Sequence, residues 1–187
     1  AHLERGAPSD AMTYLKRAND YDPLNKEGIY YLAKSYNNLG QYEQAWQLLE
    51  PSVDADEINP DFAKLTGQVL LSKKENAKAE PILFKAAEQR PEDIESVLLT
   101  CELVLDRLEK YSDPSLGNDL EKLENLLEKS GQFYPTHHQI RLHLADIDRL
   151  RGDSEKALNA YRKLSEESQH EKSVLQIGQE LIITVPE

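Results

Sequence analysis

Three histidines near residue 140 are the side chains of this sequence that most resemble metal ligands. His137, His138 and His143 are followed closely by Asp146 and Asp148. A zinc site needs two ligands on one helical face and at least one more from elsewhere. On an α-helix, His138 and His143 would point about 140° apart, and the pair His143 and Asp146 alone would make a weak site. We therefore expect no metal and no cofactor, and interpret these histidines as surface residues.

No other pattern of an enzyme active site occurs in the sequence. The glycines are isolated rather than gathered in a phosphate-binding loop, and neither Gly-x-Ser-x-Gly nor His-Glu-x-x-His is present. The single cysteine, Cys101, excludes an internal disulfide, and we expect it to be a small packing residue inside a helix. These features predict that the chain is not an enzyme.

Composition narrows the class of partner. The 187 residues carry a formal net charge of −12, which argues against non-specific binding of nucleic acid because phosphates would be repelled. There is no run of 18 apolar residues, so no membrane span is expected. Hydrophobic residues make up 39% and charged residues 30%, a balance that suits thin helical layers with a large surface.

A pattern of small and large apolar residues recurs along the chain. Each copy begins with alanine or leucine, followed at offsets of 4 and 7 by a large and a usually small residue, and in three copies by proline at offset 12. Successive copies are spaced 34, 34, 44 and 34 residues apart, and their leading residues are Ala11, Ala45, Ala79, Leu123 and Ala157. Gly40 and Gly152 stand where a residue that tolerates positive φ would end a first helix before a second one begins.

This pattern resembles the tetratricopeptide repeat, a pair of helices with a period of 34 residues. The resemblance implies an all-α fold, a right-handed superhelical solenoid of antiparallel helix pairs. It also implies that Ala45, Ala79 and Ala157 are buried where paired helices approach closely. Such a solenoid has no ready-made catalytic cleft but offers a concave surface to other proteins.

The spacing predicts one array over the whole chain. It consists of a partial repeat over 1–25, repeats over 26–59, 60–93, 94–137 and 138–171, and a closing helix over 172–187. Because Ala11 falls in a second helix whose first helix is mostly missing, we expect a fragment of a longer protein, with a processed natural terminus as the alternative.

The fourth repeat carries ten additional residues near 106–119, which we expect to form a loop that ends with Asp119 as the N-cap of the next helix. Whether this insertion binds a partner or is neutral is left open.

In this family the first helix of each repeat lines the concave groove. The resemblance therefore implies a peptide-binding groove made of Tyr30, Tyr31, Lys34, Asn37, Asn38, Lys64, Leu65, Gln68, Leu99, Glu102, His143, Asp146 and Arg149. The alternative for the two tyrosines is packing against the helices of the preceding repeat. The Lys, Asn and Arg pattern of the branch that clamps the C-terminal carboxylate of heat-shock chaperones fails at most positions, so that function is not expected.

The function that follows is a non-catalytic scaffold that binds another protein or a peptide in the concave groove. The alternative is a substrate-recruiting or assembly-chaperone arm of a larger enzyme or of an envelope or secretion complex. End-to-end self-association of the truncated array is also open, as is the choice between a cytoplasmic and a periplasmic-type soluble compartment.

Overall fold

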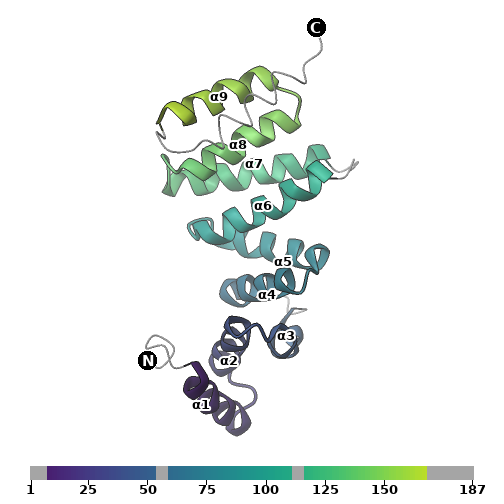
Figure 1. The fold of residues 1–187 in the computed structure, drawn as a ribbon, viewed down its shortest axis with the longest axis vertical. Coiled ribbons are helices and arrows are strands. Elements are labelled where there is room, and N and C mark those ends of the chain that lie inside the picture. The colour runs from purple at the N-terminus through teal and green to yellow at the C-terminus, as the bar shows by residue number, and fades with distance from the viewer. Residues whose placement is uncertain (1–7, 54–58, 111–115, 168–187) are drawn as a thin grey trace. The chain divides into compact units, whose positions relative to one another are not determined.

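The computed structural model of the protein describes residues 8–53, 59–110 and 116–167. Regular structure in these ranges is entirely helical (Figure 1). The elements are α1 (Pro8–Tyr21), α2 (Lys26–Asn38), α3 (Tyr42–Leu49), a 3₁₀ turn (Glu50–Ser52), α4 (Pro60–Ser72), α5 (Asn76–Gln89), α6 (Ile94–Lys110), α7 (Leu116–Phe133), α8 (His138–Leu150) and α9 (Ser154–Glu167). The all-α prediction is confirmed, while the predicted closing helix over 172–187 lies outside the described residues.

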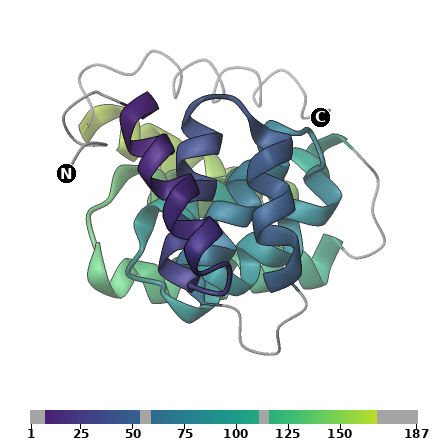
Figure 2. The same cartoon turned by 90° about the horizontal axis from the view of Figure 1, so that it is seen from below.

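The chain forms two compact units, Ala1–Gln89 and Arg90–Glu187. In the first unit α1, α2, α3, α4 and α5 pack each on the next, and Figures 1 and 2 both show α1 beside α2. In the second unit α6, α7, α8 and α9 do the same. The first helices of successive pairs also touch, α2 with α4 and α6 with α8. Consecutive pairing of helices is what the repeat spacing predicted; a single superhelical array across both units stays a prediction.

Side-chain caps explain where the first helices begin. The Asn25 side chain accepts a hydrogen bond from the Gly28 N–H at 2.9 Å, and the Asn59 side chain accepts one from the Asp61 N–H at 2.9 Å. Pro60 follows at the first helical position, where its missing N–H costs nothing. Four helices start at the first residues of the four full predicted repeats, namely Lys26, Pro60, Ile94 and His138.

The turns inside three helix pairs use a residue in the left-handed region. Gly40 has φ +70° and Gly152 has φ +90°, as their places in the sequence pattern predicted. The turn between α4 and α5 uses Lys74, with φ +62°. A side chain in this conformation costs about 1–2 kcal/mol, so Lys74 is a strained position that glycine would relieve.

Small residues set the close approach of the paired helices. Ala45, Ala79 and Ala157 are each 0% exposed, as predicted. Gly67 on α4 faces Leu83 on α5, and a Cβ added at Gly67 would lie 2.3 Å from Leu83 Cγ. Because no carbon atoms pack at that distance, α4 and α5 could not keep this spacing with any larger residue at position 67.

The ten additional residues lengthen two helices rather than form a long loop. α6 has 17 residues and α7 has 18, whereas α2, α4 and α8 have 13 each. The extensions bury Leu108 and Leu120, which a loop would leave in water. The prediction for Asp119 is therefore wrong: it lies in the first turn of α7, and Arg107 of α6 donates to its carboxylate at 2.7 Å.

α3 is shorter than the helix predicted over 42–55. It ends at Leu49, and the 3₁₀ turn Glu50–Ser52 follows. Pro51 has no N–H to donate, and its ring clashes with the preceding turn of an α-helix. We therefore attribute the early end of α3 to Pro51, although the apolar pattern predicted a helix that continues to residue 55.

Candidate functional site

Seven of the predicted binding residues lie on two touching helices of the first unit. We call this set the α2–α4 face: Tyr30, Tyr31, Lys34, Asn37, Asn38, Lys64 and Gln68. Tyr31 is 41% exposed, and Lys34 and Asn38 are also exposed. The other four are half-buried. The face therefore presents aromatic, cationic and carboxamide groups to solvent.

Tyr30 links the two helices of this face. Its ring centroid is 5.5 Å from that of Phe62 on α4 and 5.4 Å from that of Tyr31, which it meets nearly edge-on at 76°. The Lys34 ammonium lies 5.7 Å from the centre of the Tyr30 ring, within the range of a cation–π contact. Packing of Tyr30 on α4 thus places Tyr31 and Lys34 beside a contact between the two helices.

Leu65 does not belong to this face, so its prediction as a groove residue is wrong. It is 3% exposed and packs in the core of the first unit with Ala33, Leu49 and Phe62. Successive residues of an α-helix point about 100° apart, so Lys64 can reach the surface while Leu65 turns inward.

The seven residues that define the α2–α4 face include no acidic side chain, although Asp61 lies one turn before Lys64 on α4. The face contains two lysines and no carboxylate, in a protein of net charge −12. Asn37 adds a carboxamide whose Oδ1 is enclosed without a hydrogen-bond partner. A buried polar atom of this kind costs about 1–3 kcal/mol, which a donor on a ligand could recover.

The predicted residues of the second unit behave differently. Glu102 on α6 is exposed and Leu99 is half-buried. On α8, Asp146 accepts a hydrogen bond from the Tyr161 hydroxyl of α9 at 2.6 Å. Arg149 forms an ion pair with Glu109 of α6. These contacts hold α6, α8 and α9 together, so Asp146 and Arg149 are engaged within the unit.

The structure also corrects the prediction that His143 lines the groove, because only 8% of its surface is exposed. Its Nδ1 lies 3.4 Å from Asp146 Oδ2, and its Nε2 is enclosed without a partner. Burial and the hydrogen bond to Asp146 raise the pKa of the Tyr161 hydroxyl above its ordinary range. The polar group formed by His143, Asp146 and Tyr161 is thus part of the packing between α8 and α9, and a groove ligand cannot reach its histidine.

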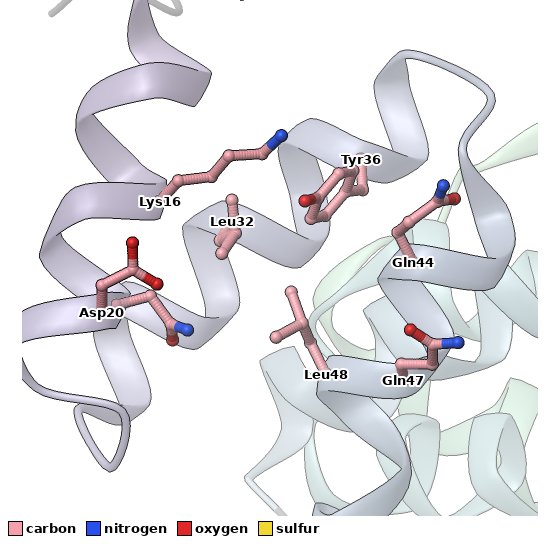
Figure 3. Close-up of a pocket in the computed structure, with 8 residues that line it drawn as sticks. Lys16, Asp20, Leu32, Tyr36, Gln44, Gln47 and Leu48 are labelled. Atoms are coloured by element: carbon pink, nitrogen blue, oxygen red, sulfur yellow. The ribbon is translucent and has the colours of Figure 1, made fainter.

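A pocket that sequence reasoning missed lies among α1, α2 and α3 in the first unit (Figure 3). Its volume is about 330 Å³, and its lining is Lys16, Asn19, Asp20, Leu32, Tyr36, Gln44, Gln47 and Leu48. Figure 3 shows Lys16 extending from α1 toward Tyr36 and Leu48 of α3 directed toward Leu32. The signal in the sequence was the pair Gln44 and Gln47 on the second helix of a repeat. The family resemblance pointed to first helices only, so this pair was not considered.

Two negative findings apply to the described part of the chain. Across 8–53, 59–110 and 116–167, no group of three or more His, Cys, Asp or Glu residues is arranged to hold a metal ion. Within the same ranges no helix is both long and apolar enough to cross a membrane.

Comparison with known proteins gives a family for the N-terminal part of the chain. Residues 2–69 match the sequence model described as tetratricopeptide repeat. A comparison with curated protein sequences finds no match.

Solved structures extend the likeness over nearly the whole chain. The fold is similar to that of YrrB, described as a TPR protein with an unusual peptide-binding site, at 17% identity and a TM-score of 0.76 over 95% of this chain and 87% of that one. A tetratricopeptide repeat protein from Parabacteroides merdae ATCC 43184 is 15% identical, with a TM-score of 0.73 over 97% of this chain and 68% of that one.

MamA from Desulfovibrio magneticus RS-1 is 24% identical, with a TM-score of 0.67 over 92% of each chain. Identities this low establish a shared fold and nothing about ligands. Residues 2–69 thus match the tetratricopeptide repeat family, and the succession of paired helices gives the chain a fold similar to that of tetratricopeptide repeat proteins.

Proposed function

We propose that this protein is a non-catalytic interaction scaffold that binds a peptide or a segment of a partner protein on the α2–α4 face. Tetratricopeptide repeats are in general modules of protein–protein interaction and are typically non-catalytic. The observation that carries the proposal is the exposure of Tyr31 beside Lys34, on a face supported by the packing of Tyr30 on Phe62. The peptide-binding site in the description of YrrB agrees with a peptide as the ligand class.

The chemistry of the face favours a segment with acidic and aromatic or aliphatic residues. Tyrosine is enriched at interfaces because its ring buries a large apolar area while its hydroxyl still finds a hydrogen bond. Lys34 and Lys64 add positive charge, which attracts carboxylates and speeds their encounter with the face.

The test begins with a partner captured from a lysate on immobilised protein, followed by measurement of its affinity with purified components. Tyr31→Ala combined with Lys64→Glu should weaken binding roughly tenfold or more, as expected when a hot spot is removed. Circular dichroism should show an unchanged helix content, because neither residue belongs to the buried core.

The matched control is Phe133→Ala combined with Lys129→Glu, an exposed aromatic residue and an exposed lysine on α7. This control should bind the partner with wild-type affinity. An equal loss of affinity in both double variants, or no loss of affinity in either, would contradict the assignment of the α2–α4 face as the binding surface.

A further inference from the structure

The pocket among α1, α2 and α3 faces away from the α2–α4 face. Leu32 and Tyr36 are one turn apart on α2 and line the pocket. Tyr30 and Lys34 are also one turn apart on α2, but they belong to the α2–α4 face. Two residues along an α-helix correspond to about 200°, so Leu32 and Lys34 point in nearly opposite directions. A ligand in the pocket would therefore contact α2 from the side opposite to Tyr30 and Lys34, whereas Tyr31 lies about 100° around the helix from Leu32.

The floor of the pocket is apolar. Leu32 is 3% exposed, and Leu48, half-buried on α3, is directed toward it (Figure 3). The volume of about 330 Å³ is near the lower limit of pockets that bind small ligands. A leucine-sized side chain together with the backbone on either side of it would fit such a space.

Carboxamides make up half of the polar part of the lining. Asn19 comes from α1, and Gln44 and Gln47 come from α3, so they approach the opening from two sides. Each carboxamide offers both N–H donors and a carbonyl acceptor, which matches the alternating donors and acceptors of a peptide backbone. The charged lining residues are one cation, Lys16, and one anion, Asp20, so the pocket does not favour an ion of either sign.

One acceptor atom of a lining residue has no hydrogen-bond donor. Asn19 Oδ1 is enclosed and has no hydrogen-bond partner. A buried acceptor without a donor is rare in native folds, and it lowers the stability of the fold by about 1–3 kcal/mol. The terminal torsion of an asparagine is broad, so a modest rotation would let this oxygen accept an N–H from a ligand in the pocket.

We propose that the pocket among α1, α2 and α3 is a second binding site, which takes an uncharged extended peptide segment with one leucine-sized side chain. The side chain rests on Leu32 and Leu48. The flanking backbone amides exchange hydrogen bonds with Asn19, Gln44 and Gln47. This site does not depend on the α2–α4 face for its ligand.

The test uses two synthetic probes, the uncharged peptides acetyl-Ala-Leu-Ala-amide and acetyl-Ala-Ala-Ala-amide, and isotope-labelled protein followed by NMR. The leucine peptide should shift the side-chain amide signals of Gln44 and Gln47 and the methyl signals of Leu48. The alanine peptide should bind at least about fivefold more weakly, because it leaves the apolar floor uncovered. No shift at these positions at about 10 mM leucine peptide would overturn the proposal.

Two sets of variants separate binding from stability. Gln44→Ala combined with Gln47→Ala should weaken the leucine peptide at least about fivefold, whereas Gln132→Ala combined with Gln139→Ala, exposed glutamines of the second unit, should leave its affinity unchanged. Asn19→Leu should raise the melting temperature, since it removes the orphaned oxygen, and should weaken the peptide. A lower melting temperature, or equal binding by the Gln44 and Gln47 double variant, would contradict the assignment.

Discussion

Residues at corresponding positions of α2 and α8 have different roles in this protein. Lys34 is the ninth residue of α2 and is exposed, whereas Asp146 is the ninth residue of α8 and holds the Tyr161 hydroxyl of α9 at 2.6 Å. Asn37 and Arg149 are the twelfth residues of the same helices. Arg149 pairs with Glu109, which belongs to the part of α6 that extends beyond the length of α2, α4 and α8.

This comparison separates two influences on a repeat protein. The period of the helix decides which side of α2 or α8 a residue points to, and this is the same in both units. The neighbouring helices decide whether that side chain stays available for a ligand or is used in packing. In the second unit, the longer α6 and the tyrosine of α9 supply partners that use the polar residues of α8.

The two units can be followed separately in one sample. Trp46, the only tryptophan, lies on α3 in the first unit and reports its unfolding by fluorescence. Cys101, the only cysteine, is 0% exposed on α6 in the second unit, and burial raises the pKa of its thiol above the ordinary range. Labelling of this thiol by a disulfide reagent therefore reports opening of the second unit.

The largest expected effect is on stability at the ninth helical position. Asp146→Ala leaves the buried Tyr161 hydroxyl without its charged acceptor and should lower the free energy of unfolding of the second unit by about 2–3 kcal/mol. Lys34→Ala removes only an exposed cation–π contact and should cost the first unit no more than about 0.5–1 kcal/mol. Denaturant titrations read by Cys101 labelling and Trp46 fluorescence measure the two values. Equal losses would remove the distinction between the units.

The next effect compares two helical glycines. Gly67→Ala drives a methyl group into Leu83, and the overlap should cost about 1–3 kcal/mol, offset by about 1 kcal/mol of better helix propensity. Gly131 on α7 has no neighbouring atom within 4 Å of an added Cβ, so Gly131→Ala should stabilise by about 0.5–1 kcal/mol. Opposite signs in melting temperature are expected. Stabilisation by both substitutions would show that α4 and α5 can move apart freely.

A pH titration tests the polar packing of α8 and α9. Tyr161 holds its proton more tightly in the folded than in the unfolded state, so its contribution is complete below about pH 10 and declines as the pH rises further. The decline can reach about 1.4 kcal/mol per pH unit. Tyr161→Phe should be less stable than wild type at pH 7, and the difference should shrink above about pH 10. A constant difference measured by urea unfolding at each pH would exclude this role.

The smallest effect concerns the turns. Lys74→Gly should raise the free energy of unfolding by about 0.5–1 kcal/mol, because glycine adopts positive φ without strain but loses more entropy on folding. Gly152→Ala places a side chain in the same backbone region and should destabilise the second unit by a similar amount. Thermal melts of the two variants give the comparison, and a destabilised Lys74→Gly protein would be the contrary result.

Much of the fold could be predicted from sequence because the repeat pattern is local. The spacing of Ala45, Ala79 and Ala157 predicted buried helix contacts, and Gly40 and Gly152 predicted turns with positive φ. Both depend on packing within one helix pair or on one backbone conformation. Prolines and insertions were harder, since Pro51 ended α3 early and the additional residues lengthened α6 and α7.

The candidate site could be predicted only in part. The repeat register placed Tyr31 and Lys34 on the surface, but it also assigned Leu65 to the groove, although that side chain is buried in the core of the first unit. The partners of Asp146 and Arg149 come from helices 15 and 40 residues away in the sequence, so no local pattern reveals them. The pocket among α1, α2 and α3 likewise depends on the spacing of three helices rather than on any motif.

The most direct test of the α2–α4 face is hydrogen–deuterium exchange of the protein with and without its captured partner. Binding should protect amides around Tyr30 to Lys34 on α2 and around Lys64 to Gln68 on α4, and should leave exchange around Asp146 on α8 unchanged. The Tyr31→Ala and Lys64→Glu double variant should lose this protection at the same partner concentration. Protection on α8 with none on α2 or α4 would contradict the assignment of the binding surface to the first unit.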